Sequence, residues 1–243
     1  MTTRAPISTS SAPSTVIDVW TFALDVPETA ALGALLSADE RQRANRLQHP
    51  DDAARFSIAH GRLREILASY LHIDPALITF GVDGHEKPFI ASLETPLRFN
   101  ISHSGDLAAI AVSRIGEVGI DIERIRILEG PDLEPMFSAS EQASFAELAG
   151  GARREAFFRC WTRKEALLKA WGRGLDVPLD SFDVPVGPEP DVVVRVADEM
   201  GNTRDWRLIS FTPQEGYAGT LAVAAEGIGR SIALDHRAWP PAG

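Results

Sequence analysis

The chain has 243 residues, 44% of them hydrophobic, which is enough to bury a core in one large domain or two small ones. Its 24 basic and 34 acidic residues give a net charge of −10, which opposes binding to nucleic acid or to an anionic membrane. No apolar run approaches the roughly 18 residues of a membrane span, and the single cysteine, Cys160, predicts a buried thiol in a reducing, cytoplasmic compartment.

The first predicted elements are a tail, a strand and three helices. Residues 1–14 are rich in Ser, Thr and Pro and predict a flexible N-terminal tail. A strand is predicted over 16–24, and helices over 28–36, 39–47 and 51–71, with Ser37 as the cap of the second helix. In the longest helix, the apolar spacing places Arg55, Arg62 and Arg64 on or beside the side that faces water.

Short strands and two more helices follow. Strands are predicted over 78–82, 88–91, 97–101, 107–113 and 118–123, and later over 192–196, 206–211 and 218–224. Ser138-Ala-Ser-Glu141 has the form of a capping box and begins a helix that runs to Leu148. A second helix covers about 155–171 and ends at Gly172-Arg-Gly174. This pattern predicts an α+β fold, and the similarity of 105–112 to 219–225 hints at two related halves.

Three carboxylates are candidate metal ligands. Asp121 and Glu123 alternate with two isoleucines, so an extended chain sends both acids to one face, about 7 Å apart, where they could share a hard cation. Glu165 interrupts the apolar stripe of its helix. Three oxygen ligands suit Mg²⁺ better than Zn²⁺. The alternatives are a solvated sheet face for the first two acids and a surface ion pair between Glu165 and Lys169.

Two regions are candidates for anion binding. The turn at Ser102, His103 and Ser104 presents hydrogen-bond donors, although His103 could equally be structural. A Ser–His hydrolase is disfavoured, because adjacent Ser and His cannot readily meet in attack geometry and no Gly-x-Ser-x-Gly motif occurs. A second region is a basic cluster, which could hold a phosphate or form an ordinary solvated helix face. Its members are Arg41, Arg43, Arg46, Arg55, Arg62 and Arg64.

Taken together, these segments resemble the 4′-phosphopantetheinyl transferases of the surfactin-synthetase-activating type, which modify carrier proteins using coenzyme A. The likeness spans roughly 16–225, and its motifs follow the family's order and approximate spacing. The motifs are Lys87-Pro88, Phe99-Asn-Ile-Ser-His103, Gly119-Ile-Asp-Ile-Glu123 and Trp161-Thr-Arg-Lys-Glu-Ala-Leu-Leu-Lys169, with Gly172 and Gly174 after them.

The resemblance implies a pseudo-twofold arrangement of two similar α/β halves, each with a small, largely antiparallel sheet packed on a long helix. We expect residues 15–115 to form an N-terminal half with the coenzyme A nucleotide contacts. Residues 116–230 would form a C-terminal half with the metal and catalytic residues, and 231–243 a C-terminal tail. The resemblance also indicates a monomer.

By position, the resemblance assigns Asp121, Glu123 and Glu165 as ligands of Mg²⁺, with Mn²⁺ as an alternative metal. It assigns Glu165 as the general base and Lys169 as the residue that assists the departing phosphate. The residues implied to contact coenzyme A are Arg43, Arg55, Lys87, Pro88, Asn100, Ser102, His103, Lys164 and Lys169.

The implied reaction transfers phosphopantetheine from coenzyme A to a serine of an apo carrier protein and releases adenosine 3′,5′-bisphosphate. The acceptors would be carrier proteins of fatty acid, polyketide or nonribosomal peptide synthesis, with a role in secondary metabolite biosynthesis. A metal-dependent phosphodiesterase and a noncatalytic binding module are the alternatives. Two departures affect the nucleotide contacts: Glu86 stands where the family usually has Gly, and Glu40 where a basic residue is common.

Overall fold

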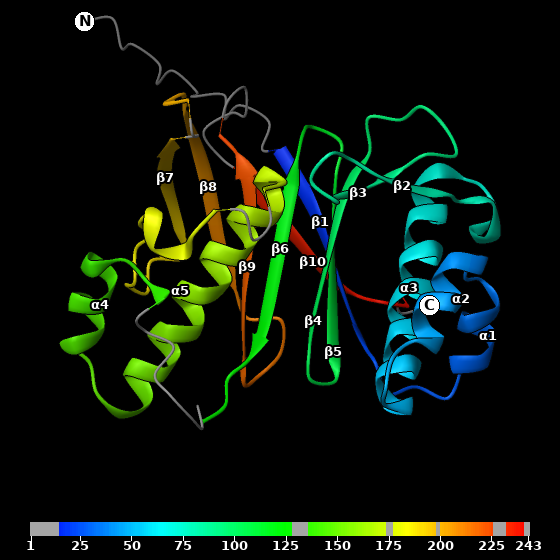
Figure 1. Ribbon diagram of the computed structural model, residues 1–243, viewed down its shortest axis with the longest axis horizontal. Helices are drawn as coiled ribbons and strands as arrows, with labels where there is room; N and C mark the ends of the chain where they lie inside the picture. Colours follow the sequence, from blue (N-terminus) through cyan, green and yellow to red (C-terminus); the bar gives the residue numbers. More distant parts are fainter. Residues whose placement is uncertain (1–14, 128–135, 174–176, 198–199, 226–231, 241–243) are drawn as a thin grey trace, which may run out of the picture.

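Two β-sheets pack against each other between two groups of helices, which gives the layer order helix, sheet, sheet, helix (Figure 1). The computed structural model describes residues 15–127, 136–173, 177–197, 200–225 and 232–240. One core lies beneath each group of helices, and a third lies between the sheets. The predicted α+β class is confirmed by these helices and small sheets.

The first sheet has the strand order β10-β1-β5-β4, in which β5 is antiparallel to both of its neighbours. The strands are β1 (Thr15–Ala23), β4 (Arg98–Ser104), β5 (Leu107–Ser113) and β10 (Ile232–Ala238). Strand β5 coincides with its predicted range and is buried on both faces. Its Ile110 belongs to the core under the helices, and its Ala109 belongs to the core between the sheets.

Strand β10 corrects the predicted C-terminal tail over 231–243. It pairs in parallel with β1, with Leu234 opposite Ile17. Its Ile232 and Leu234 are partly buried against the core between the sheets. Trp239 follows, and its ring packs edge-on against Trp20 with the ring centroids 5.2 Å apart.

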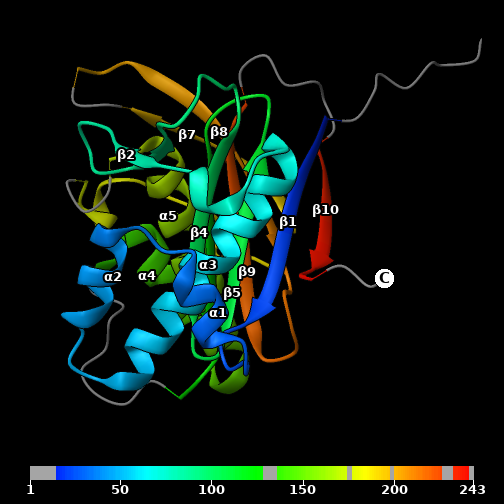
Figure 2. The same cartoon turned by 90° about the vertical axis from the view of Figure 1, so that its right-hand side faces the viewer.

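Three helices cover the outer face of the first sheet (Figure 2). They are α1 (Thr29–Ala34), α2 (Ala38–Asn45) and α3 (Pro50–Leu71), followed by η1 (Pro75–Leu77) and by the separate ribbon of β2 (Phe80–Val82) and β3 (Pro88–Ile90). Ser37 caps α2 as predicted. Its Oγ accepts the backbone N–H of Glu40 at 3.2 Å, and the Glu40 carboxylate accepts that of Ser37 at 2.8 Å.

The expectation that Arg62 and Arg64 face water is wrong. Arg64 is 1% exposed, and its guanidinium donates two hydrogen bonds to Oε2 of Glu40, at 2.7 and 3.0 Å. A third bond, of 2.6 Å, goes to the carbonyl of Ile78. The charge can be buried because a carboxylate from α2 neutralises it, and α2 is thereby held against α3.

The second sheet is antiparallel throughout, with the order β6-β9-β8-β7. Its strands are β6 (Val118–Arg124), β7 (Asp191–Ala197), β8 (Thr203–Phe211) and β9 (Tyr217–Ala224). Its helices are α4 (Ala139–Ala146), α5 (Gly150–Trp171) and η4 (Leu179–Ser181). The capping box at Ser138 and the stop at Gly172, which adopts φ 74°, are both confirmed, whereas α5 begins five residues before its predicted start.

A second buried ion pair holds α4 against α5. Lys164 on α5 is completely buried, and its ammonium lies 2.8 Å from the carboxylate of Glu141. The same ammonium donates to the carbonyls of Leu179 and Phe182, at 2.7 and 2.5 Å. All three N–H donors of Lys164 are therefore used inside the protein.

The predicted thiol of Cys160 is buried on α5. Within the ranges that the structure describes, no helix is both long enough and apolar enough to cross a membrane.

Candidate functional site

A cavity of about 430 Å³ opens where β4, β6 and α5 meet. Its polar wall contains most of the residues that the sequence singles out. The lining residues are Ile101, Ser102, His103, Asp121, Glu123, Met136, Trp161, Glu165, Lys169 and Leu179. The structure thus brings together the three predicted metal ligands, both predicted catalytic residues and two residues of the predicted anion-binding turn.

Strand β6 reaches this cavity because Gly119 allows it to lie directly on α5. A Cβ atom at Gly119 would lie 2.1 Å from the carbonyl oxygen of Ala166 and 2.3 Å from the backbone nitrogen of Ala170. Only glycine fits at this crossing. Because side chains alternate along a strand, Asp121 then faces α5 beside Glu165 and Lys169.

Strand β4 supports β6 from the other side. The side-chain carbonyl of Asn100 accepts the N–H of Ile120 at 2.8 Å, and Ser102 Oγ accepts the N–H of Ile122 at 3.3 Å. Asn100 and Ser102 are both buried, and Asn100 does not line the cavity. Their hydrogen bonds hold the two sheets at a fixed register beside the carboxylates.

Asp121 is the most deeply buried of the three acids, at 4% exposed. Its Oδ1 accepts hydrogen bonds from Lys169 at 2.7 Å and from Ser102 at 2.8 Å. Burial raises the pKa of Asp121, and the charge of Lys169 opposes this change. Its other oxygen, Oδ2, is buried and has no hydrogen-bond partner among the described residues. An orphaned carboxylate oxygen that faces a cavity is a free position for a cation or a donor.

Glu123 and Glu165 are half-buried on the same wall. Desolvation raises the pKa of both carboxyls, and the negative charge of Asp121 raises both further. Glu123 accepts a hydrogen bond from Ser104 at 2.6 Å. Among the described residues, none donates a hydrogen bond to Glu165.

The donor set of this cavity fits a hard divalent cation, since it consists of carboxylate oxygens that include the buried, unpaired Oδ2 of Asp121. In the described part of the chain, however, no three Asp, Glu, His or Cys side chains lie close enough together to hold a metal as they stand. The Lys169 ammonium is the cation that contacts Asp121 in this structure. A bound metal would therefore require the carboxylates to turn toward one another.

Basic side chains extend from the cavity toward α2 and α3. His103 is exposed at the cavity edge, and its pKa is lowered by partial desolvation, by Lys169 and by the positive charges of His60 and Arg55. Arg43 lies 5.6 Å from the centre of the Phe56 ring on α3. Arg43 and Arg55 do not line the cavity itself, so an anion that contacts them would extend beyond it.

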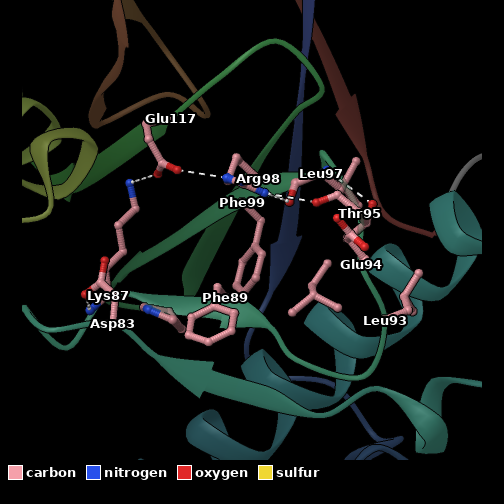
Figure 3. Close-up of a pocket in the computed structure, with 12 residues that line it drawn as sticks. Asp83, Lys87, Phe89, Leu93, Glu94, Thr95, Leu97, Arg98, Phe99 and Glu117 are labelled. Atoms are coloured by element: carbon pink, nitrogen blue, oxygen red, sulfur yellow. Dashed lines mark hydrogen bonds and ion pairs between the residues drawn. The ribbon is translucent and has the colours of Figure 1, made fainter.

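Lys87 and Pro88 line a different cavity, of about 350 Å³ (Figure 3). The Lys87 ammonium donates to Oε2 of Glu117 at 2.6 Å and to the carbonyl of Ala170, at the end of α5, at 3.1 Å. Arg98 donates to the other oxygen of Glu117 at 2.8 Å. In this structure Lys87 therefore links the β2–β3 ribbon to the second sheet and to α5.

The remaining assigned residue and the two departures lie apart from the carboxylates. Lys164 does not reach the cavity, against our expectation, because its ammonium is committed to Glu141 and two carbonyls. Glu40 belongs to the cap of α2 and to the ion pair with Arg64. Glu86, which stands where the family usually has Gly, adopts φ 63°, a left-handed conformation that glycine takes without strain.

Comparison with known proteins gives two family matches. The family described as the 4′-phosphopantetheinyl transferase superfamily matches residues 117–223, and a second, described as 4′-phosphopantetheinyl transferase, N-terminal, matches residues 25–115.

Three curated relatives illustrate the similarity. The chain is 34% identical over 219 residues to the 4′-phosphopantetheinyl transferase HetI of Nostoc sp., covering 87% of this chain and 89% of the relative. It is 33% identical over 175 residues to a 4′-phosphopantetheinyl transferase of Bacillus subtilis and 28% identical over 175 residues to the 4′-phosphopantetheinyl transferase Sfp of the same species. These last two matches each cover 72% of this chain and 77% of the relative.

Proposed function

Starting from the fact that this chain belongs to the 4′-phosphopantetheinyl transferase superfamily, we propose how its cavity carries out the reaction. The chain is an enzyme that transfers phosphopantetheine to carrier proteins. The donor in our proposal is coenzyme A, and the acceptor is a serine hydroxyl of the carrier protein. The acceptor could belong to fatty acid, polyketide or nonribosomal peptide synthesis. We place the reaction in the cytoplasm, which is consistent with a sequence that has a single, buried cysteine.

The observation that carries this proposal is the orphaned Oδ2 of Asp121, a residue that lines one cavity with Glu123, Glu165 and Lys169. Asp121, Glu123 and Glu165 would hold Mg²⁺, or Mn²⁺ in its place. When bound, the metal would neutralise charge on the diphosphate of coenzyme A. A cation held by these residues would offset the mutual repulsion of the three carboxylates.

Glu165 is the proposed general base. Its carboxylate accepts the proton of the carrier serine while the serine oxygen forms a bond to the β-phosphorus of coenzyme A. The bond from that phosphorus to the bridging oxygen breaks, and adenosine 3′,5′-bisphosphate leaves.

Lys169 is the proposed electrostatic partner of the leaving group. Its side chain is 29% exposed and lines the cavity, and its ammonium contacts Asp121. Lys169 would donate a hydrogen bond to the departing phosphate and stabilise its charge. Ser102 and His103 would lie along the diphosphate and the nucleotide phosphate, and Arg43 and Arg55 would extend that contact away from the cavity.

Lys87 and Pro88 remain candidates for the adenine site, but their cavity is distinct from that of the carboxylates. The buried ion pair of Lys164 supports a role in holding α4 and η4 rather than in binding the diphosphate.

We also propose that the two halves of the chain, 15–115 and 116–230, are related by a pseudo-twofold axis in a monomer. This is supported by the matching strand orders β1-β5-β4 and β6-β9-β8, and by the 22-residue helices α3 and α5. Two equivalent ion pairs also support it, one between Glu40 and Arg64 and one between Glu141 and Lys164. Each joins a capping-box glutamate to the long helix of its half.

The experiment is to incubate the enzyme with coenzyme A, Mg²⁺ and an apo carrier protein and to measure the mass of the carrier. Asp121→Asn, Glu123→Gln and Glu165→Gln should each lower transfer by about 100-fold or more without unfolding the protein. Glu155→Gln is the matched control, since Glu155 is exposed on the same helix but lines another cavity. Full activity of Asp121→Asn at limiting Mg²⁺ would contradict the metal assignment.

The same assay tests the two alternatives. A phosphodiesterase would cleave coenzyme A when no carrier protein is present, and a binding module would retain coenzyme A or the carrier without any change in carrier mass.

A further inference from the structure

The edges of the two sheets meet at β4 and β6 without a backbone hydrogen-bond ladder between them. Side chains of β4 take the place of that ladder. Ile120, Ile122 and Arg124 on β6 each donate a backbone N–H to β4, and the acceptors are side-chain oxygens of Asn100, Ser102 and Ser104, respectively. Because side chains point to the same face at every second residue, three polar residues in alternation can serve one edge of β6.

The two serines each make a second hydrogen bond, and both follow one pattern. Ser102 Oγ accepts the N–H of Ile122 at 3.3 Å and donates to Oδ1 of Asp121 at 2.8 Å. Ser104 Oγ accepts the N–H of Arg124 at 3.1 Å and donates to Oε2 of Glu123 at 2.6 Å. Each hydroxyl thus joins the backbone N–H of one residue to the carboxylate of the residue before it.

The double role fixes the direction of the hydroxyl proton. A serine hydroxyl has one proton to donate and two lone pairs. When one lone pair of the hydroxyl oxygen accepts a backbone N–H, the hydroxyl proton must point away from that N–H. Here it points to the carboxylate. The rigid edge of the sheet therefore sets the orientation of a flexible glutamate side chain, which has three rotatable bonds to lose on binding a ligand.

We propose that Ser104 is a positioning residue, which holds one oxygen of Glu123 at the cavity wall and so limits the conformational freedom that Glu123 loses when a metal binds. The inference rests on the proposed function, because it takes Glu123 as a metal ligand. Ser104 donates to Oε2 of Glu123, and within the described part of the chain no donor occupies the other oxygen, which could bind the cation. Hydrogen bonds of this kind to ligating carboxylates orient the ligand and raise metal affinity.

Ser104 tests this idea more cleanly than Ser102. Ser102 is buried and also accepts a hydrogen bond from Lys169 at 3.2 Å, so its removal would disturb Asp121 and Lys169 together. Ser104 is half-buried and acts on Glu123 alone among the three acids. Ser113 on the adjacent strand β5 supplies a matched control. It is a buried serine that accepts one backbone N–H, from Ile115 at 3.3 Å, and it forms no hydrogen bond with a carboxylate of the described residues.

The experiment measures Mn²⁺ binding by electron paramagnetic resonance, with coenzyme A present and the carrier protein omitted so that no transfer occurs. We expect Ser104→Ala to weaken Mn²⁺ binding about 10-fold. Ser104→Thr, which keeps the hydroxyl, should restore most of that loss, and Ser113→Ala should bind Mn²⁺ as the unaltered enzyme does. In transfer assays, the Mg²⁺ concentration for half-maximal rate should rise by a similar factor while the rate at saturating Mg²⁺ changes much less.

The possible results separate two failures. If the unaltered enzyme binds no Mn²⁺ in the presence of coenzyme A, the proposed metal site fails. If it binds Mn²⁺ and Ser104→Ala binds equally well, the metal site stands and the role of Ser104 is overturned. A lower melting temperature with unchanged Mn²⁺ affinity would also overturn it, since Ser104 would then serve only the junction between the sheets.

Discussion

Gly119 gives the sharpest test of how packing builds the cavity. It lies where β6 crosses α5, and the backbone atoms of Ala166 and Ala170 occupy the space that a side chain would need. In Gly119→Ala the new methyl group would lie 2.1 Å from the Ala166 carbonyl oxygen, against 3.4 Å for an ordinary contact. The strand and the helix would have to separate by about 1 Å, because both obstacles are backbone atoms that cannot rotate away.

This displacement should affect stability and catalysis together. Overpacking of a well-packed contact typically costs about 1–3 kcal/mol of unfolding free energy, and the upper part of that range applies because neither partner is a flexible side chain. Asp121 lies two residues beyond Gly119 and would move away from Glu165 and Lys169. A misplacement of about 1 Å among catalytic groups can cost about 100-fold in rate.

Urea denaturation measures the first effect, and the mass shift of an apo carrier protein measures the second, under conditions in which the variant is folded. Gly151→Ala is the control, since Gly151 is in α5 and has open space around its Cβ position. That variant should keep the activity and unfold at the same or a higher urea concentration, because alanine favours a helix. The reasoning about the crossing is refuted if Gly119→Ala retains both the midpoint and the rate of the unaltered enzyme.

Three further predictions concern single side chains. Lys164→Met should lower the unfolding free energy by about 3–5 kcal/mol, because it leaves the buried Glu141 without its cation; a loss below about 1 kcal/mol in urea denaturation would contradict this. For Glu165→Gln, the unfolding free energy of the variant minus that of the unaltered metal-free enzyme should increase as pH rises. A carboxyl with a raised pKa stabilises the fold below its ordinary value of 4.5 and loses that contribution as pH passes the raised pKa, whereas glutamine does not titrate. Chemical denaturation in EDTA at about pH 4 and pH 8 measures the difference, and equal differences at both pH values would exclude it. Glu86→Gly should raise the unfolding free energy by up to about 1 kcal/mol by relieving the left-handed backbone, and a clear drop in melting temperature would count against that strain.

Local sequence signals predicted the fold wherever the cause lay within a few residues. The caps at Ser37 and Ser138 depend on a glutamate three positions later, and the stop at Gly172 depends on one residue that tolerates positive φ. Strand β5 was predictable because a continuous apolar run is buried on both faces.

The errors have long-range causes. The apolar spacing of α3 predicts that Arg64 faces water. It is buried because Glu40, 24 residues earlier in the sequence, forms an ion pair with it. Lys164 is buried for the same reason, because Glu141 forms an ion pair with it. Strand β10 is short, and three polar residues in a row interrupt its apolar pattern. Its only described strand partner is β1, at the opposite end of the described chain. No window of neighbouring residues contains these partners.

Motif spacing predicted the residues of the candidate site, but it did not predict which cavity each of them lines. The motifs identify Asp121, Glu165 and Lys169, which line one cavity. They do not reveal that Lys87 lies in another cavity, or that Met136 and Leu179 line the wall of this one. A usable signal for Ser104 was present, since Asn100, Ser102 and Ser104 are polar residues at every second position of their strand.

The pairing of β10 with β1 constrains how this chain can be made. During synthesis the first sheet could assemble from β1, β5 and β4 as soon as they leave the ribosome, but one edge of β1 would stay open until the last described strand emerged. An open edge can recruit strands from other nascent chains. We therefore expect a fragment that ends near residue 115 to aggregate when expressed alone, and co-expression with the remainder of the chain to rescue its solubility.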